Sequence, residues 1–463
     1  MLSSCLNPTL RWFILILYVL LGILFAVRTP DWQAPDEPAH YNYIAQVATN
    51  GCCPTILPGD WDSAYLDTLK SARFNIELLG SLSTIQYEDH QPPLYYLLAS
   101  VVYRLTNGSL LALRLFSVVI GLGVVLCAEA VTRAVVRERQ AVPLGVMAFV
   151  AFLPQHIAML SAVNNDGLAE LIVGLTLLFT VRYLQGGATG NIKPWQLGLL
   201  VGLGFVTKLS TYFMAGVVVV ALLLHWWEAE EIPSTRDLKP YHWRALLRSL
   251  AAFLIPALLL GSIVWVANVN TYGFPDFFGQ RQHNLVVADQ PRTADRIAEI
   301  GLMSYLSDAV EITFKSFWGL FGWMGLPMQN WIYYILFAVT FASVTGLLGE
   351  LVIIPDKQPR QKDSPAQRDV WRIIWLAGIL AVLAYFYYNT EFLQLQGRYM
   401  FPGLIPIAIG MVIGLHTWGM ILLKYVFFSR TSLVAYFPLA VSLALALLDF
   451  YLIWRVIPPG LAP

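Results

Sequence analysis

Charged residues are scarce in this sequence. Asp, Glu, Lys and Arg make up 13% of its 463 residues, whereas soluble globular proteins carry about 25%. Hydrophobic residues make up 57%, and the mean hydropathy is +0.61. This composition excludes an ordinary soluble protein. It predicts an all-α polytopic membrane protein.

Several other features are missing as well. The formal net charge is zero and there is no basic tail, so nothing indicates nucleic acid as a partner. The four cysteines, Cys5, Cys52, Cys53 and Cys127, show no metal-ligand spacing, and the adjacent pair is not expected to form a disulfide with itself. We find no internal repeat of fixed period and no separate soluble domain. We therefore expect a single membrane domain over residues 1–463.

Long apolar runs predict the membrane-spanning helices. About 20 apolar residues are needed to cross a bilayer, and this rule gives about eleven spans, within a range of about 10 to 13. The expected spans lie near residues 12–27, 115–132, 142–162, 167–184, 195–207, 211–227, 247–268, 331–354, 373–389, 400–423 and 432–455. The segment 93–106 has only about 14 residues and begins at a Pro-Pro pair. It is either a short twelfth span or an interfacial helix.

Positive charge predicts the orientation of these spans. If 93–106 does not cross, every second loop faces the side of the N-terminus, and these loops are basic, near residues 133–139, 182–193, 236–248, 357–372 and 424–430. Cytoplasmic loops carry such an excess of Lys and Arg. We therefore expect a protein of the cell (inner) membrane with a cytoplasmic N-terminus, an interfacial 93–106 and an extracytoplasmic C-terminus.

This topology places two long segments, 28–114 and 269–330, on the outer side, where functional residues are expected. The first contains TPDWQAPDEPAHYNY, in which Asp36, Glu37 and His40 follow the first span and Pro35 and Pro38 restrict the backbone. Taken alone, these acids are compatible with a solvated interface loop.

A second acidic cluster lies later in the same segment. In YEDHQPPLYY, the residues Glu88, Asp89, His90 and Gln91 precede the Pro-Pro pair at the start of 93–106. Acidic residues before a helix commonly stabilise its N-terminus. The cluster therefore either stabilises the start of this helix or forms a second part of a functional site.

Three further charged residues are expected on the outer side. Asp166 lies in NNDGLAEL between two spans, where it is either a helix cap or a site residue. Lys208 interrupts a long apolar stretch, and a lysine at membrane depth needs a partner or a wet cavity. Arg398, beside Tyr399 in QGRYMFPGLIP, is placed to anchor to lipid head groups or to bind a substrate phosphate. The aromatic stretch 311–334 indicates an interface belt or packing, and alternatively the wall of a sugar or lipid groove.

Together these residues suggest one class of chemistry. A carboxylate can accept the proton of an acceptor hydroxyl that attacks an activated carbon, while Arg and Lys neutralise a departing phosphate. If the phosphate carries a long lipid, the reaction takes place at the membrane surface.

Seven short motifs carry a resemblance to a known superfamily. They occur in order between about residues 30 and 410, as APDEPAH (34–40), HQPPLYYLL (90–98), LRLFSVVIG (113–121), NNDGLAEL (164–171), FVTKLS (205–210), SFWGLFGW (316–323) and QGRYMFPGLIP (396–406). With them the chain resembles the GT-C superfamily of membrane glycosyltransferases, which includes protein O-mannosyltransferases and aminoarabinose transferases. It most resembles a bacterial family of predicted membrane proteins with a Pro-Asp-Glu-Pro-x-His motif after the first helix.

The resemblance implies a GT-C-like fold with an extracytoplasmic active site, a sugar donor on polyprenyl phosphate, and catalysis with inversion. It implies catalytic roles for Asp36 or Glu37, for Asp89 or His90, and for Asp166. The substrate-binding candidates are His40, Glu88, Gln91, Lys208, Arg398 and Tyr399. The large luminal domain of the mannosyltransferases is missing, so the acceptor, whether glycan, lipid or protein, does not follow.

No cofactor is certain from the sequence. A divalent cation, Mg²⁺ or Mn²⁺, is a candidate, with Asp36, Glu37, Asp89 and His90 as its candidate ligands. Membrane lipids and a lipid-linked sugar donor are the expected partners. Two alternatives to an enzyme stay open: a transporter or flippase of lipid-linked sugars, and a non-catalytic membrane partner in cell-surface glycan assembly. Spans with few charges favour chemistry at the surface over transport.

Overall fold

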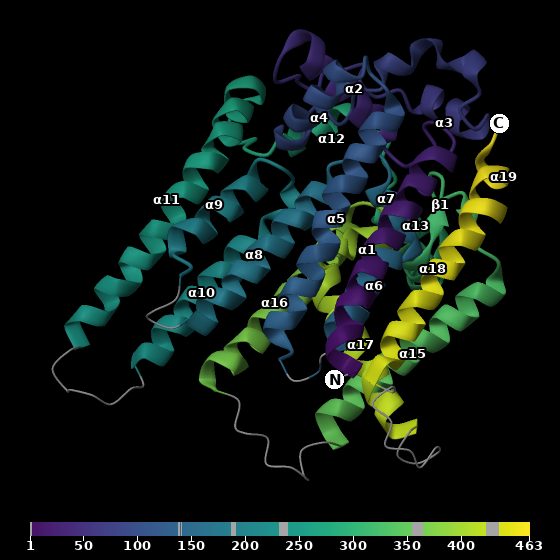
Figure 1. Ribbon diagram of the computed structural model, residues 1–463. Coiled ribbons are helices and arrows are strands. Elements are labelled where there is room, and N and C mark those ends of the chain that lie inside the picture. Colours follow the sequence, from purple (N-terminus) through teal and green to yellow (C-terminus); the bar gives the residue numbers. More distant parts are fainter. Residues whose placement is uncertain are drawn as a thin grey trace.

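The structure is a computed structural model that describes residues 2–137, 139, 141–186, 191–230, 239–353, 364–422 and 435–463. The chain forms a bundle of long helices, and one end of the bundle is capped by the residues between α1 and α5 (Figure 1). The helices are α1 (Leu2–Arg28), α2 (Glu37–Asn50), α3 (Ser63–Ser71), η1 (Ile76–Thr84), α4 (Leu94–Leu105), α5 (Leu110–Val135), α6 (Val142–Phe152), α7 (Pro154–Leu160), α8 (Asp166–Gly186), α9 (Pro194–Phe205), η3 (Leu209–Thr211), α10 (Phe213–Glu230), α11 (Lys239–Tyr272), α12 (Gln280–Val286), α13 (Thr293–Ile300), α14 (Leu302–Trp318), α15 (Asn330–Ile353), α16 (Pro365–Glu391), η4 (Gly397–Gly403), α17 (Leu404–Leu422), α18 (Phe437–Arg455) and α19 (Ile457–Leu461). Two short strands, β1 (Leu320–Phe321) and β2 (Leu326–Pro327), form an antiparallel pair.

The predicted all-α membrane architecture is confirmed. Within the described ranges, nine helices are long and apolar enough to cross a membrane, and a tenth span is formed if α6 and α7 count as one. These two helices meet at an angle of 65°, because Pro154 follows Leu153 and keeps it out of helical conformation. The expected span at 195–207 is the 12-residue helix α9, so the count of about eleven is not confirmed.

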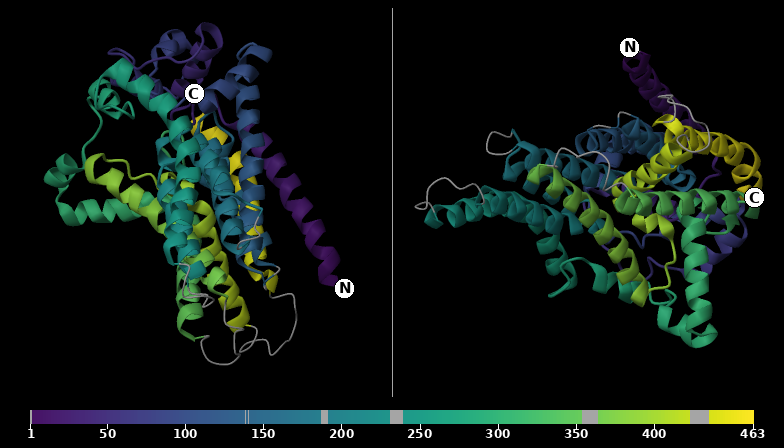
Figure 2. Two further views of the ribbon diagram at one scale, coloured as in Figure 1. Left: turned by 90° about the vertical axis from the view of Figure 1, so that its left-hand side faces the viewer. Right: turned by 90° about the horizontal axis from the view of Figure 1, so that it is seen from below.

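The direction of the chain through the bundle follows from α1 and α5. Near the start of α1, Nε of Arg11 donates to Glu129 near the end of α5 at 2.6 Å, and Arg133 donates to the same carboxylate. The two helices are thus antiparallel, and α4 does not carry the chain to the other end. The N-terminus and the C-terminus lie at opposite ends of the bundle (Figures 1 and 2). The basic loops predicted near 236–248, 357–372 and 424–430 lie partly outside the described residues.

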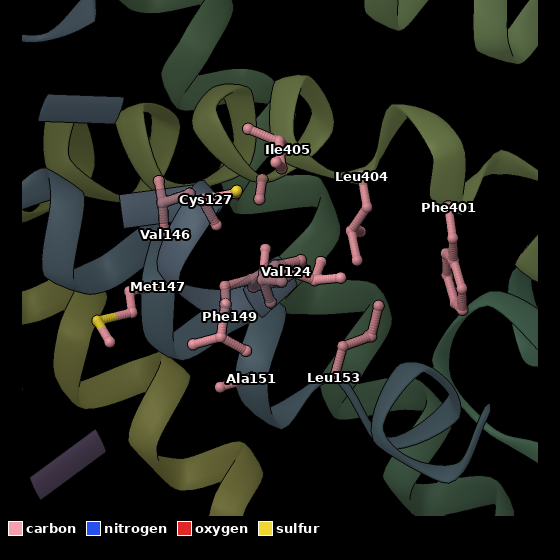
Figure 3. Close-up of a cluster of buried hydrophobic side chains, with 14 of the residues drawn as sticks. Val124, Cys127, Val146, Met147, Phe149, Ala151, Leu153, Phe401, Leu404 and Ile405 are labelled. Carbon is pink, nitrogen blue, oxygen red and sulfur yellow. The ribbon is translucent and has the colours of Figure 1, made fainter. Parts of the chain in front are cut away.

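The core is centred on α6. All eleven residues of this helix are buried, as expected for a helix that is apolar on every side. Figure 3 shows Val146 and Phe149 of α6 among side chains from α5, from η4 and from the start of α17. The span prediction at 142–162 therefore identified a central element of the fold.

Two glycines allow a close helix contact at the edge of the bundle. A side chain at Gly198 of α9 would collide with the backbone of α11 at Phe253, and one at Gly202 would collide with the side chain of Leu260. This spacing of two small residues, four apart, lets membrane helices approach closely. The contact holds the short α9 against α11, just before the chain reaches Lys208.

The segment 28–114, which we call the first outer segment after its predicted side of the membrane, covers one end of the bundle. Tyr43 of α2 stacks on Tyr96 of α4 with ring centroids 3.6 Å apart, and Arg104 of α4 donates to the carbonyl of Val47 at 3.1 Å. With only 12 residues and several exposed apolar side chains, α4 has the properties of the expected interfacial helix. This packing gives the acidic clusters of the segment a rigid support.

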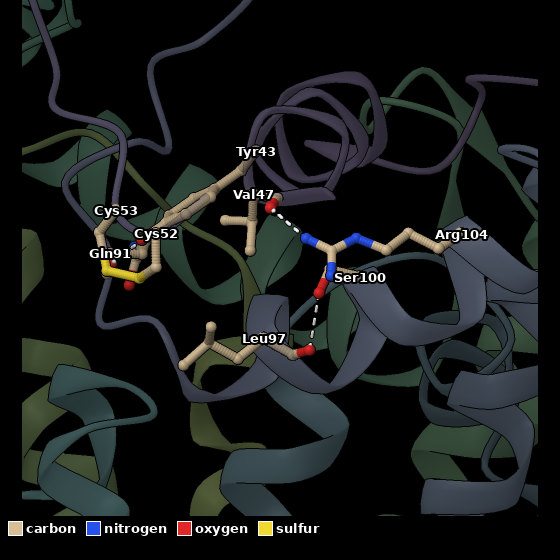
Figure 4. Close-up of a disulfide and its surroundings, with 8 residues drawn as sticks. All are labelled: Tyr43, Val47, Cys52, Cys53, Gln91, Leu97, Ser100 and Arg104. Carbon is tan, nitrogen blue, oxygen red and sulfur yellow. Dashed lines mark hydrogen bonds between the residues drawn. A yellow bond between two sulfur atoms is a disulfide. The ribbon is translucent and has the colours of Figure 1, made fainter. Parts of the chain in front are cut away.

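One prediction for this segment is wrong. Cys52 and Cys53 form a disulfide with each other, next to Tyr43 and Gln91 (Figure 4). The peptide bond between the two cysteines is cis, and their Cα atoms are 3.0 Å apart. The expectation assumed a trans peptide, in which adjacent Cα atoms are about 3.8 Å apart.

The aromatic stretch 311–334 serves mainly in packing. Trp318 is buried in the core, and the indole of Trp323 donates to the carbonyl of Trp32 at 3.0 Å. Trp323 also stacks on Phe74. The segment 269–330, which we call the second outer segment, is thereby attached to the first outer segment. Trp331, at the start of α15, is exposed, as expected of a residue in an interface belt.

Candidate active site

Asp36 lies directly before α2, and its carboxylate points away from that helix. The residue has φ of 66° and makes no side-chain capping bond. Its Oδ2 accepts a hydrogen bond from Nη2 of Arg398 at 2.8 Å, and its Oδ1 accepts one from the hydroxyl of Tyr87 at 2.9 Å. Left-handed backbone is unfavourable for most residues other than glycine, and residues held in it cluster at functional sites.

The pKa of Asp36 reflects these neighbours. Burial alone would raise the pKa, but the charges of Arg398 and His40 and the hydrogen bonds from Arg398 and Tyr87 outweigh burial and lower it below the usual value. Asp36 is therefore ionised at neutral pH. While Arg398 is bound, the carboxylate is a weak base.

Glu37 points into the bundle instead. Nε of Arg114 donates to Oε1 at 2.8 Å, Nη2 donates to Oε2 at 2.6 Å, and the amide of Val163 donates to Oε1 at 3.2 Å. Glu37 and Arg114 are both buried, and Arg114 also donates to three backbone carbonyls within residues 26–30. Successive side chains of a helix point about 100° apart, which explains why the two neighbouring acids face different surroundings. The catalytic role expected for Glu37 stays a prediction, and its geometry is that of a positioning residue.

Asp166 and Lys208 form a second pair of acid and cation. Nζ of Lys208 donates to Oδ1 of Asp166 at 2.5 Å and to Oδ1 of Asn165 at 2.7 Å. The expected capping role falls to Asn164, whose side chain accepts from the amide of Asp166 at 2.9 Å. The carboxylate of Asp166 is thereby left for Lys208.

His40 connects the two pairs. Its Nδ1 lies 2.8 Å from the hydroxyl of Tyr96. Burial lowers the pKa of His40, and the charge of Lys208 lowers it further, whereas the charges of Glu88, Asp36 and Asp166 raise it. His40 thus lies close to both pairs and to Glu88, so residues from five separate parts of the sequence meet at one end of the bundle.

The second acidic cluster contributes two carboxylates with free oxygens. Oε2 of Glu88 and Oδ1 of Asp89 are buried and have no hydrogen-bond partner among the described residues. The other oxygen of Asp89 accepts from Gln46 at 2.7 Å. Burial raises the pKa of Asp89 to about 8. Buried polar atoms are usually hydrogen-bonded, so these two oxygens are available to a ligand or to water.

The remaining candidates lie around this centre. The ring of His90 packs on that of His283 with centroids 4.3 Å apart, and burial and then the charge of His283 lower the pKa of His90. The side-chain oxygen of Gln91 lies 3.4 Å from the amide nitrogen of Asn165. Tyr399 lies beside Arg398, and its ring meets that of Tyr388 edge to face.

The four candidate metal ligands do not form one ligand set. Glu37 is bound to Arg114 and Asp89 to Gln46. In the part of the chain that the structure describes, no group of three or more His, Cys, Asp or Glu side chains is arranged to hold a metal ion. A divalent cation therefore stays a prediction from the sequence, and we derive no step through a metal ion.

Two polar pairs of this region were not predicted. Arg114, which holds Glu37, lies within the apolar run of α5, and a charge inside such a run is itself a signal of a buried partner. His156 of α7 bonds Glu170 of α8 through Nε2 at 2.6 Å, and both residues are buried. This second pair joins the two helices on either side of the loop 161–165, which precedes Asp166.

Comparison with known proteins identifies the family. Residues 80–408 match the family described as "Predicted membrane protein (DUF2142)", which is more than half of the 463 residues. The chain belongs to this family. The match includes Glu88, Asp166, Lys208 and Arg398, whereas Asp36 lies before the matched region. No curated protein matches the sequence of this DUF2142 member.

Solved structures show which fold the DUF2142 chain has. The oligosaccharyltransferase AglB of Archaeoglobus fulgidus, in complex with an inhibitory peptide and a dolichol-phosphate, is 12% identical, with a TM-score of 0.50 over 99% of this chain and 56% of that chain. Another structure of the Archaeoglobus fulgidus oligosaccharyltransferase, tethered to an acceptor peptide, is 13% identical, with a TM-score of 0.49 over 97% and 55%. ArnT of Cupriavidus metallidurans, bound to undecaprenyl phosphate, is 14% identical, with a TM-score of 0.45 over 99% and 74%.

The similarity to AglB concerns the fold. It confirms the predicted GT-C architecture of the DUF2142 chain, which spans little more than half the length of the archaeal enzyme.

Proposed function

We propose that the protein is an integral membrane glycosyltransferase that transfers a sugar from a polyprenyl-phosphate-linked donor to an acceptor on the extracytoplasmic side. One observation carries the proposal. Two pairs of acid and cation, Asp36 with Arg398 and Asp166 with Lys208, lie close to His40 at the end of the bundle that the first outer segment covers. Such a site offers both a base for a hydroxyl group and cations for a phosphate.

The cations suit the leaving group. Arginine binds phosphate oxygens through two parallel N–H bonds, and lysine binds them as a point charge. In the free protein these charges are neutralised by Asp36 and Asp166. A donor phosphate would replace one or both carboxylates as the partner of Arg398 and Lys208.

This exchange would activate Asp36. Once Arg398 turns to the phosphate, the carboxylate loses its strongest stabilising charge and becomes a better base. The acceptor oxygen then forms a bond to the anomeric carbon, the bond from that carbon to the phosphate oxygen breaks, and its electron pair leaves with the phosphate. The hydroxyl proton passes to Asp36. One displacement of this kind inverts the anomeric centre.

Other candidates hold the substrate. The free Oε2 of Glu88 is available to a sugar hydroxyl or to the attacking acceptor. Glu37 and Arg114 fix the start of α2, and so the direction in which Asp36 points. AglB, which shares the fold, was solved with a dolichol-phosphate. A long lipid phosphate is consistent with a site at the end of a membrane bundle.

One feature favours the alternative of transport. The span formed by α6 and α7 is broken at 65°, and broken helices are common in transporters. Transport and transfer make different products: a flippase moves the donor unchanged, whereas a transferase releases polyprenyl phosphate.

The test uses Asp36→Asn with Asp67→Asn as the matched control, since Asp67 is an exposed acid of the same outer segment. Both proteins are purified, placed in lipid nanodiscs and supplied with polyprenyl-phosphate sugars and an envelope glycan extract. We expect Asp36→Asn to lower the release of polyprenyl phosphate by roughly 100-fold or more, as for loss of a general base, while Asp67→Asn has no effect. Release at the wild-type rate by Asp36→Asn would refute the role of Asp36. In a parallel assay with the wild type in sealed vesicles, movement of intact donor across the membrane without any release of polyprenyl phosphate would favour transport.

A further inference from the structure

A cavity lies beside the candidate active site. It has a volume of about 530 Å³, which is within the roughly 300–1,000 Å³ of small-molecule sites. Its walls come from α13, from α14 and from the segment 393–396 that leads into η4. Leu393 of this segment donates its amide to the carbonyl of Pro291 at 2.9 Å, which ties two of the walls together.

The cavity is connected to Asp36 by a chain of hydrogen bonds. Gln394 and Gln396 line the cavity. The side-chain Nε2 of Gln396 donates to Oε1 of Gln394 at 2.7 Å. Nε of Arg398 donates to Oε1 of Gln396 at 2.7 Å, and Nη2 of Arg398 donates to Asp36. Gln396, in the wall of the cavity, is therefore linked to the carboxylate of Asp36, the proposed base, through the side chain of Arg398.

The charged side chains that line the cavity are two arginines, Arg292 and Arg296, and three acids, Asp295, Glu299 and Asp308, so acids outnumber cations. Arg296 donates to Glu299 at 3.0 Å and to Asp308 at 3.3 Å, and Arg292 donates to Glu391 at 2.6 Å. Because each arginine already faces a carboxylate, the cavity has no excess positive charge to attract a phosphate. It instead presents N–H donors and carboxylate acceptors side by side, which suits a neutral ligand with many hydroxyl groups.

The other walls are apolar. Tyr305 and Ile312 of α14 line the cavity together with Leu395. The opposite face of α14 is exposed and apolar, with Met303 and Val310 more than two-thirds exposed. In the left view of Figure 2 the green helices of this region project to the side of the bundle. A site with polar groups on one wall and apolar groups on another matches a sugar ring, which has hydroxyl edges and C–H faces.

We propose that this cavity binds the acceptor, and that the acceptor is a neutral saccharide. The inference rests on the proposed function, because it assigns the second substrate of the same site. The donor phosphate occupies the side of Lys208 and Arg398, and the acceptor reaches Asp36 from the side of Gln396.

The test measures binding, which does not depend on transfer. The probes are fluorescently labelled neutral di- to tetrasaccharides and their dodecyl glycosides, titrated against the full chain in nanodiscs. Binding of both sets indicates a free saccharide, and binding of the glycosides alone indicates a lipid-carried one.

Two variants alter the cavity and one serves as a control. Ile312→Trp fills the cavity from its apolar wall, and Asp308→Asn removes a carboxylate from its polar wall. The control, Glu311→Gln, changes an exposed acid on the same helix, paired only with Lys315 among the described residues. We expect the first two variants to weaken saccharide binding at least about tenfold, as for loss of about one charged hydrogen bond, and the control to bind as the wild type does.

The two proposals fail in different ways. If no probe binds the wild type, or if binding survives both Ile312→Trp and Asp308→Asn, the acceptor cavity is refuted, whatever Asp36→Asn does to transfer. If Asp36→Asn transfers normally while both cavity variants lose binding, the catalytic role of Asp36 is refuted and the acceptor cavity stands.

Discussion

The neighbouring acids Asp36 and Glu37 should respond differently to mutation: Asp36→Asn should lower the transfer activity, and Glu37→Gln should lower the stability. Glu37→Gln leaves Arg114 as a charge without an ionic partner in a buried site, where its side chain is 3% exposed. Removing one partner of a buried ion pair costs about 3–5 kcal/mol. Arg114 keeps its bonds to three backbone carbonyls, and Asp31 lies 3.7 Å away. We therefore expect a loss at the lower end of this range, about 3 kcal/mol.

The assay is thermal unfolding in a mild detergent. At roughly 2 °C per kcal/mol, the slope for long chains, Glu37→Gln should lower Tm by about 6 °C. The exposed control Glu311→Gln should change it by less than about 2 °C. The double variant with Arg114→Gln should lose less than the sum of the single variants, by roughly 1–3 kcal/mol.

The result that would refute this reasoning is specific. If Glu37→Gln unfolds at the wild-type temperature, shows no coupling to Arg114 and abolishes transfer, then Glu37 is the catalytic acid and its pairing with Arg114 is not structural.

Three further outcomes are expected. The raised pKa of Asp89, about 8, means that the folded protein keeps a proton that the unfolded chain loses near pH 4. Asp89 therefore destabilises the fold increasingly from about pH 4 to about pH 8, and no further above pH 8. The Tm of Asp89→Asn should rise relative to that of the wild type between pH 5 and pH 8, and parallel curves of Tm against pH would contradict this. Lys208→Gln should weaken the binding of undecaprenyl phosphate, measured by native mass spectrometry, by roughly 10- to 100-fold, the effect of one charged hydrogen bond. The control Lys70→Gln in the first outer segment should bind as the wild type does, and equal affinities of Lys208→Gln and wild type would show that Lys208 does not bind the phosphate. Gly198→Leu should collide with the backbone at Phe253 and lower the yield of folded protein, and a normal yield would show that α9 and α11 can separate without loss.

The sequence predicted the general fold well, because hydropathy is a property of local runs. Two of the predicted spans differ from regular spans in the structure, for physical reasons. The run at 142–162 is as long as a span, yet Pro154 breaks it. The run at 195–207 is apolar, yet its helix ends at Phe205 after 12 residues, just before Lys208.

The sequence suggested candidate residues for the site, whose roles stay predictions, but it did not predict how they pair. The prolines and the basic loops placed Asp36, Asp166, Lys208 and Arg398 on the same side. That Arg398 binds Asp36 could not be predicted, because 362 residues separate them and only the packing of the bundle joins them. Arg114 is a charge within an apolar run, and this pattern alone predicts a buried partner for its side chain.

The central claim concerns where the donor phosphate binds. A structure of the protein with undecaprenyl phosphate, determined by electron cryomicroscopy in nanodiscs, tests it most directly. We expect the phosphate within hydrogen-bonding distance of Arg398 or Lys208, with at least one of the pairs to Asp36 and Asp166 broken. A phosphate bound elsewhere, with both ion pairs intact, would contradict the account.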